Sequence, residues 1–188
     1  DVAGARSERS GRVRDRLQSD LHRVLELGAC ADLTDGALPW RPIGEVPQDK
    51  KYAGEPTRLE IGDGNTIREY CTLNCGTVQD AGVTRIGNRN LFMAYAHVAH
   101  DCHVGDHVVM ANSATLAGHV TIEDHAIVGG LVAIHQFVRI GESAILGGGA
   151  MVTLDVAPFC MAAGDRAALH GLNVIGLQRR GFGPSTIQ

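Results

Sequence analysis

Histidines gather in one part of the chain, and their spacing is the first sign of chemistry. Seven of the nine histidines lie between residues 97 and 135. An imidazole titrates near neutral pH, accepts a proton from a hydroxyl nucleophile and also ligates metal ions. Three uses therefore compete: a general base, a metal site of the His97-x2-His100-x2-His103 kind, and outward-facing surface histidines. Spacing alone does not separate a base from a metal ligand.

A six-residue period determines where these histidines lie. Every sixth residue from 86 to 152 is apolar, and the position four residues after each is small or β-branched in eleven of twelve repeats. This period fits neither a helix nor an alternating strand, but it fits a short strand followed by a turn. We predict an all-β parallel β-helix with three repeats to a coil and the aliphatic side chains inside. We also expect the glycine that often follows the aliphatic residue to relax the backbone at each corner.

The repeat converts sequence into approximate geometry, because adding 18 to a position moves it one coil along the same column. His100, His119 and His135 then share one face, each offset by one residue. His107 and His125 are predicted to stack on another column.

Asp101 follows His100 and could orient its ring, as carboxylates often do. Neighbouring strand residues point to opposite faces, so this pairing requires a corner. Cys102 occupies a small inward position and is predicted to be a core residue. Cys71 and Cys75 lack the second pair of a zinc pattern and are interpreted as buried or loop thiols.

Composition limits the class of protein. The chain has 24 glycines among 188 residues, which argues against a helix bundle. A net charge of −4 excludes a strongly basic nucleic-acid binder, and no apolar run is long enough for a transmembrane segment. Five cysteines without a disulfide-framework spacing indicate a reducing, cytoplasmic compartment.

Three regions are expected: an N-terminal segment and linker at 1–43, the β-helix at 44–164 and a C-terminal tail at 165–188. Apolar residues between 13 and 25 predict a short helix, either a cap over the coil stack or a loosely attached tail. Residues 78–82 interrupt the period and predict an excursion loop. Two polar motifs lie outside the period, Asp49-Lys50-Lys51-Tyr52 and Gln178-Arg179-Arg180-Gly181, and both suit phosphate or carboxylate contacts.

From about residue 43 to 182 the chain resembles the UDP-N-acetylglucosamine O-acyltransferases of lipid A biosynthesis. The motifs that carry the resemblance are IGEVPQDKKYAGEPTRLEIGDGNTIRE, AHVAHDCHVG, ATLAGHV, VGGLVAIHQF and GLQRRGF. The resemblance implies a left-handed β-helix, a homotrimer, and transfer of a 3-hydroxyacyl group from acyl carrier protein to the sugar 3-hydroxyl, with no metal or other cofactor. Members of this family extend beyond the matched segment at both ends, so a truncated chain is expected.

The resemblance also implies roles for individual residues. His100 falls at the general base with Asp101 beside it, and the Gly118 amide falls at the oxyanion donor. Gly148 occupies the position that limits acyl chain length. The remaining matches are substrate-binding positions: Asp49, Lys51, His97, His119, His135, Gln136, Asn173 and Arg179.

Two other functions remain open from the residues. A metalloenzyme similar to the γ-class carbonic anhydrases would use histidine triads on the same kind of β-helix, and it predicts bound zinc or iron. A truncated, inactive paralogue would keep the coil without turnover.

Overall fold

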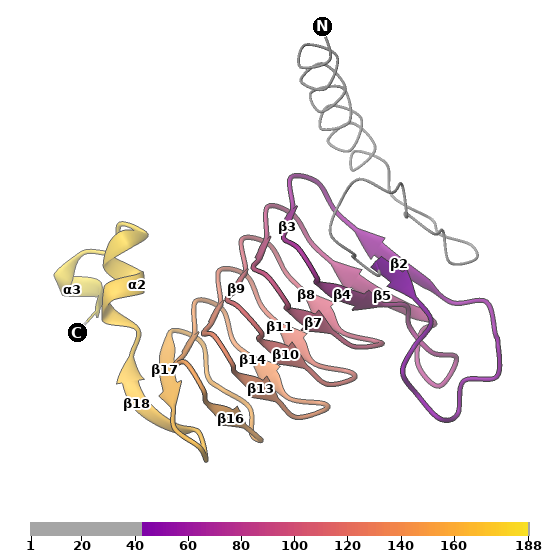
Figure 1. The fold of residues 1–188 in the computed structure, drawn as a ribbon. Helices are drawn as coiled ribbons and strands as arrows, with labels where there is room; N and C mark the ends of the chain where they lie inside the picture. The colour runs from indigo at the N-terminus through magenta and orange to yellow at the C-terminus, as the bar shows by residue number, and fades with distance from the viewer. Residues whose placement is uncertain (1–42, 188) are drawn as a thin grey trace, which may run out of the picture.

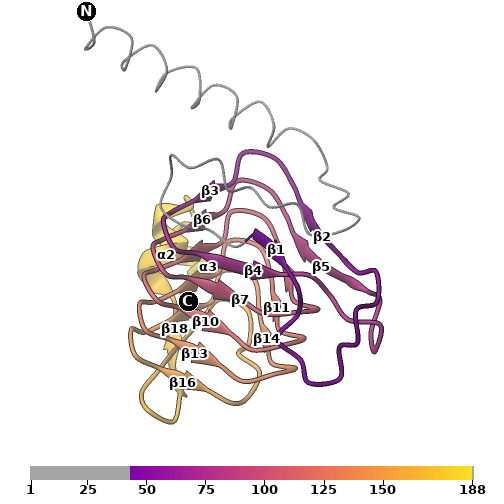
Figure 2. The ribbon, with the colours of Figure 1, turned by 45° about the vertical axis from the view of Figure 1, so that its right-hand side comes forward.

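The structure, a computed structural model, describes residues 43–187. Its strands form three sheets along the sides of a left-handed β-helix, all of them parallel except for one antiparallel strand at the C-terminal end (Figures 1 and 2). The first sheet contains β1 (Ile43–Glu45), β4 (Thr72–Asn74), β7 (His97–Val98), β10 (Thr115–Leu116), β13 (Ala133–Ile134) and β16 (Met151–Val152). The second contains β2 (Arg58–Ile61), β5 (Val83–Ile86), β8 (His103–Val104), β11 (Thr121–Ile122) and β14 (Arg139–Ile140). The third contains β3 (Thr66–Ile67), β6 (Leu91–Phe92), β9 (Val109–Met110), β12 (Ile127–Val128), β15 (Ile145–Leu146), β17 (Cys160–Ala163) and β18 (Ala168–Leu172).

Strand register confirms the predicted coil. Leu116 pairs with Val98 on one side and with Ile134 on the other, so each partner occupies the equivalent position of the neighbouring coil. Each coil hydrogen-bonds to the next through short parallel ladders, the arrangement expected for a strand-and-turn repeat. Positions in one column can therefore be compared directly by sequence number.

Aliphatic side chains fill the interior as the period predicts. Phe92, Met110 and Leu116 are completely buried, and the small column beside them, including Ala96 and Cys102, is buried too. Each large side chain contributes about 1.5–3 kcal/mol by leaving water. The complete burial of Cys102 confirms it as a core residue, and this burial raises the pKa of its thiol to about 12.

The corners differ from the prediction. Glycines that follow the aliphatic position do not have positive φ; instead, a Cβ on Gly87 would lie 2.6 Å from the Gly105 carbonyl oxygen, and one on Gly129 would lie 2.6 Å from that of Leu146. Glycine is needed there because the next coil is too close for a side chain. The left-handed corner residues recur every six positions and are mostly not glycine: Arg89, Tyr95, Asp101, His107, Ser113, His119, His125, Leu131, Phe137 and Ser143.

The predicted excursion loop is confirmed. Residues 75–82 connect β4 to β5 without strand structure, and this loop crosses the corner beside the histidines. Cys71 and Cys75 are buried, and their thiols approach the carbonyl oxygens of Met93 and Gly44 at 3.1 and 3.2 Å, as expected for structural thiols.

At its C-terminal end the coil stack gives way to a hairpin and two short helices. β17 pairs in parallel with β15 and antiparallel with β18, and α2 (Val174–Arg179) and α3 (Pro184–Ile187) follow (Figure 1). The helix predicted in the first 43 residues lies outside the described part of the chain. Among residues 43–187, no helix has the length and apolar character needed to cross a bilayer.

Candidate active site

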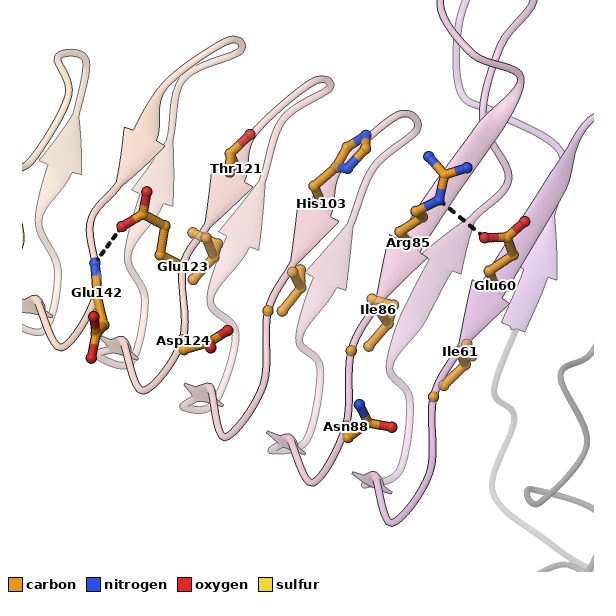
Figure 3. A pocket seen from close by; sticks show the side chains of 15 residues that line it. Glu60, Ile61, Arg85, Ile86, Asn88, His103, Thr121, Glu123, Asp124 and Glu142 are labelled. Atoms are coloured by element: carbon orange, nitrogen blue, oxygen red, sulfur yellow. Dashed lines mark hydrogen bonds and ion pairs between the residues drawn. The ribbon is translucent and has the colours of Figure 1, made fainter. Parts of the chain in front are cut away.

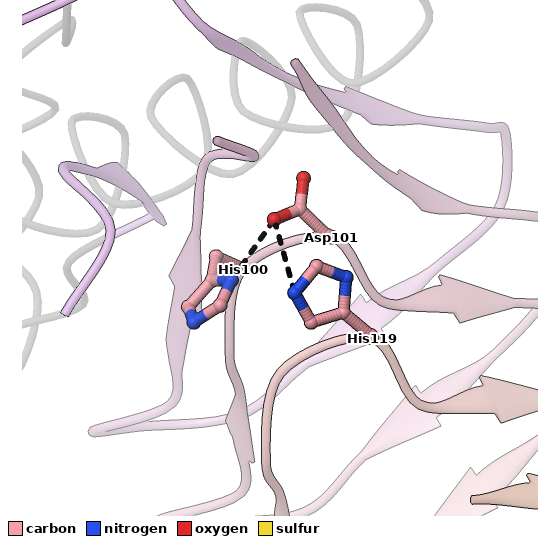
Figure 4. A group of neighbouring side chains, drawn as sticks. All are labelled: His100, Asp101 and His119. Atoms are coloured by element: carbon pink, nitrogen blue, oxygen red, sulfur yellow. Dashed lines mark hydrogen bonds and ion pairs between the residues drawn. The ribbon is translucent and has the colours of Figure 1, made fainter. Parts of the chain in front are cut away.

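His100 and Asp101 form a dyad at the corner between β7 and β8. His100 Nδ1 lies 2.9 Å from Asp101 Oδ2 (Figure 4). Asp101 has a φ of 58°, in the left-handed region. This turn is the corner that the pairing of two adjacent side chains requires. A neutral His100 that donates Nδ1–H to the carboxylate keeps a lone pair on Nε2, which is the tautomer of a general base.

Asp101 is buried, and its carboxylate is held by the excursion loop. The Thr77 amide donates to Oδ1 at 2.8 Å and the Thr77 hydroxyl to Oδ2 at 2.6 Å. The Asp101 amide in turn donates to Thr84 Oγ1 at 2.8 Å. Hydrogen bonds of this kind offset the cost of burying a carboxylate. Asp101 is therefore a fixed acceptor for His100.

His119 lies one coil further along the stack and meets His100 edge to face. The two ring centroids are 5.2 Å apart at an interplanar angle of 88°, and the Phe137 ring stacks on His119 with a centroid separation of 4.5 Å. His119 Nδ1 lies 3.1 Å from Asp80 Oδ2, and this hydrogen bond lowers the pKa of the Asp80 carboxyl. The ring is thus restrained on several sides.

Gly118 lies directly against the His100 ring. A Cβ at Gly118 would be 2.5 Å from Cε1 and 2.8 Å from Nε2 of His100. Among the described residues the Gly118 amide donates no hydrogen bond, whereas its carbonyl accepts one from Phe137. A free N–H beside the basic nitrogen is a suitable donor for a developing oxyanion.

His97 stands on β7, shortly before the dyad in the chain, and is half-buried. Its Nδ1 makes a short hydrogen bond with Thr72 Oγ1. Burial, and secondarily the nearby His100, hold the pKa of His97 below its usual range. His97 is thus a neutral hydrogen-bonding group at neutral pH.

This lowered pKa predicts an acid-sensitive contribution to stability. Below the unfolded value of about 6.5, the unfolded chain takes up a proton that folded His97 resists, so stability falls as the pH drops through that value. His97→Gln should therefore lose less of its melting temperature than the unsubstituted protein between neutral and mildly acidic pH. Thermal unfolding followed by circular dichroism measures the difference, and parallel curves for the two proteins would refute it.

The other predicted positions form neither a hydrogen bond nor a ring contact with the His100–Asp101 dyad within residues 43–187. His135 is exposed, with Nδ1 3.1 Å from the carbonyl oxygen of the equally exposed Gln136, and it forms neither a ring contact nor a hydrogen bond with His119. Phe137, not His135, is the ring stacked on His119. Gly148 is at a corner two coils beyond Asn112, facing the Gly130 carbonyl.

The two polar motifs are placed on connecting segments at opposite ends of the stack. Asp49 and Lys51 lie in the loop after β1, where Asp49 Oδ1 accepts the Lys51 amide at 3.0 Å. Arg179 is exposed in the last turn of α2 and has no side-chain partner among residues 43–187, whereas the Arg180 guanidinium donates to Glu142 at 3.2 Å. Of these two arginines, Arg179 is the one left for a ligand.

Asn173 has a structural role. It caps α2, with Oδ1 accepting the Gly176 amide at 3.1 Å and Nδ2 donating to the Ser143 carbonyl at 2.9 Å. It is buried. These bonds fix the helix that carries Arg179 to the coil stack.

Sequence analysis did not predict three residues of the cluster: Thr77, Asp80 and Phe137. Phe137 could have been predicted, because it lies one coil after His119 in the same column. Thr77 and Asp80 could not, because their loop lies outside the repeat. The predicted stack of His107 on His125 is confirmed, with ring centroids 4.8 Å apart.

A separate groove of about 700 Å³ runs over the second sheet (Figure 3). Charged side chains line it, including Glu60 paired with Arg85 at 3.0 Å and Glu123 hydrogen-bonded to Arg139 at 2.7 Å. His103 is on its wall. Glu60 and Glu123 are thus already engaged by arginines, and the groove does not include the His100 dyad.

The cluster also contains residue types that could bind a metal ion. One ligand atom from each of His100, Asp101 and His119 lies within 4.8 Å of the others. However, Thr77 occupies both carboxylate oxygens of Asp101, and His100 Nδ1 points at that carboxylate instead of toward a shared point. The donor set is arranged as a hydrogen-bonded dyad, which fits a metal poorly.

Comparisons with known proteins point to one enzyme family. A family model described as UDP N-acetylglucosamine O-acyltransferase, domain 2, matches residues 155–188, and a bacterial transferase hexapeptide model matches residues 84–118. The acyl-[acyl-carrier-protein]--UDP-N-acetylglucosamine O-acyltransferase of Thiobacillus denitrificans is 59% identical over 140 residues, 74% of this chain and 54% of the relative. That of Alkalilimnicola ehrlichii is 59% identical over 146 residues, 78% of this chain and 57% of the relative.

Solved structures give the same picture. LpxA from Acinetobacter baumannii is 50% identical, with a TM-score of 0.77 over 79% of this chain and 57% of that one. The UDP-N-acetylglucosamine O-acyltransferase of Moraxella catarrhalis is 53% identical, with a TM-score of 0.76 over 78% of this chain and 57% of that one. This chain spans about half the length of the curated relatives it matches. Over about three quarters of its own length, the chain belongs to the UDP-N-acetylglucosamine O-acyltransferase family.

Proposed function

We propose that this chain transfers a 3-hydroxyacyl group from acyl carrier protein to the 3-hydroxyl of UDP-N-acetylglucosamine, an early step of lipid A synthesis. The observation that carries the proposal is the His100–Asp101 dyad with the Gly118 amide against its ring. The names of the relatives supply the substrates, and the dyad supplies the chemistry.

The reaction needs a base and an oxyanion donor. His100 Nε2 takes the proton as the sugar oxygen attacks the thioester carbonyl carbon, and the Gly118 N–H stabilises the negative charge on the carbonyl oxygen. The tetrahedral intermediate then expels the carrier thiolate, which accepts the proton from the His100 imidazolium. The new ester bond replaces the thioester bond, and no acyl-enzyme forms.

Binding of the sugar nucleotide falls to the surrounding polar groups. Asp49 and Lys51 come from one connecting loop, and Arg179 offers a guanidinium suited to the diphosphate. His97, His119, His135 and Gln136 complete the substrate-binding set. Because Asp49 and Lys51 lie at one end of the coil stack and Arg179 at the other, we propose a homotrimer in which neighbouring chains complete each site.

Gly148 is proposed to set acyl chain length. Its missing side chain leaves room for a long chain at the corner above the Gly130 carbonyl. Gly148→Met should shift preference toward shorter 3-hydroxyacyl donors, because the added side chain occupies that room. The measurement compares kcat/KM across donors of increasing length. An unchanged order of preference would remove Gly148 from this role.

A metalloenzyme is the second candidate, favoured by the close approach of His100, Asp101 and His119. The purified chain should transfer acyl groups from 3-hydroxyacyl carrier protein at a rate unaffected by chelators, and should not hydrate carbon dioxide. Hydration that depends on added zinc or iron would favour the metalloenzyme. A folded chain with neither activity would support the inactive paralogue.

A further inference from the structure

The excursion loop at residues 75–82 supports both side chains that surround His100. Its Thr77 donates to both oxygens of Asp101, at 2.8 and 2.6 Å. Three residues later, Asp80 bonds His119 Nδ1 at 3.1 Å. One irregular segment therefore touches the dyad's carboxylate and the adjacent imidazole.

Among residues 43–187, Asp80 is the only hydrogen-bond partner of the His119 ring. The other nitrogen, Nε2, lies 3.8 Å from Asp101 Oδ2, which is too long for a hydrogen bond. Phe137 fixes the plane of His119 by stacking, but stacking does not distinguish one ring nitrogen from the other. The bond to Asp80 does, because a carboxylate accepts only from a protonated nitrogen.

The orientation of His119 matters because its ring packs edge-on against His100. A flip about the bond to the ring would exchange carbon and nitrogen atoms at this contact. It would also change the polarity that His100 and a substrate hydroxyl meet. A partner that prevents the flip holds the surroundings of the base in one state.

We propose that Asp80 is a positioning residue of the acyl-transfer site. It keeps His119 protonated on Nδ1 and oriented against His100. The inference rests on the proposed function only for its kinetic consequence, because the orientation itself is a property of the unliganded chain.

Imidazole nitrogen NMR tests the orientation directly. The full chain is labelled with ¹⁵N-histidine, and the His119 signals are identified by their loss in His119→Gln. We expect a protonated Nδ1 in the unsubstituted protein. Asp80→Ala should move the His119 nitrogens toward the other tautomer or an average, while Asp80→Asn, which keeps an acceptor oxygen, should retain the original pattern. Unchanged His119 signals in Asp80→Ala would overturn the proposal.

Kinetics test the consequence. Asp80→Ala should lower kcat about three- to tenfold, the effect of one hydrogen bond of ordinary net strength, with little change in KM for the sugar nucleotide. Asp80→Asn should restore most of the rate. Gln79→Ala, an exposed neighbour in the same loop, is the matched control and should leave both unchanged.

The NMR and kinetic experiments distinguish a failure of the proposed function from a failure of the positioning role. If the unsubstituted chain transfers no acyl group but the NMR pattern responds to Asp80→Ala, the proposed function fails and the positioning role stands. If transfer is active and kcat in Asp80→Ala equals that of the unsubstituted protein, the positioning role in catalysis is refuted.

Discussion

Replacing His100 with alanine is expected to lower kcat/KM by about 10²–10⁴-fold, the usual contribution of a positioned acid–base group. The substitution removes the only dyad nitrogen that faces away from Asp101. Binding of the sugar nucleotide should change less than kcat, because Asp49, Lys51 and Arg179 lie elsewhere. The rate loss is measured from initial rates over a range of acceptor concentrations.

The fold should survive this substitution. His100 is at a corner and not in the apolar interior, so its loss opens no core cavity. The melting temperature and far-ultraviolet spectrum of His100→Ala provide the control. A well-folded variant with an undiminished rate would remove His100 from the role of base.

Gly118→Ala is expected to cost roughly 10²-fold in kcat, the scale of a displacement of about 1 Å at a reacting group. The added Cβ would meet three atoms of the His100 ring, at 2.5, 2.8 and 3.1 Å, so the ring must move. The displaced ring then no longer lies beside the Gly118 amide as it does in the present site.

Gly130→Ala is the matched control for this prediction. Gly130 occupies the same position of a later repeat, and a Cβ there would approach nothing closer than 3.4 Å, at the Asn112 carbonyl oxygen. With a short-chain donor, which does not reach the corner at Gly148, this control should leave the rate nearly unchanged. Equal rates in Gly118→Ala and the unsubstituted protein would show that the contact with His100 does not matter for turnover.

The six-residue repeat made the fold predictable, together with the cluster residues that lie on the repeat. Steps of one coil place Asp101, His119 and Phe137 in one column, and the same step stacks His107 on His125. The pairing of His100 with Asp101 was predictable on the condition that a corner lies between them, because adjacent residues of a strand point to opposite faces. In each case the periodic backbone converts sequence separation into distance.

The rest of the site and the role of the glycines depend on contacts that the six-residue period does not predict. Asp80 reaches His119 from a distant point of the sequence through an irregular loop. The glycines after the aliphatic positions were assigned to backbone freedom, but they are required by close approach of the next coil. The sequence also did not show that Arg180, and not Arg179, would be engaged within the chain. Glu142 and Ser143, which bind Arg180, come from an earlier coil.

Formation of the sugar ester tests the central claim most directly. The chain is incubated with 3-hydroxyacyl carrier protein and UDP-N-acetylglucosamine, and the product is identified by mass spectrometry with its position of acylation. We expect a 3-O-acyl product whose formation by His100→Ala is reduced by about 10²-fold or more. A folded chain that forms no ester, or that forms it equally well without His100, would contradict the assignment of His100 as the base of an acyl transfer.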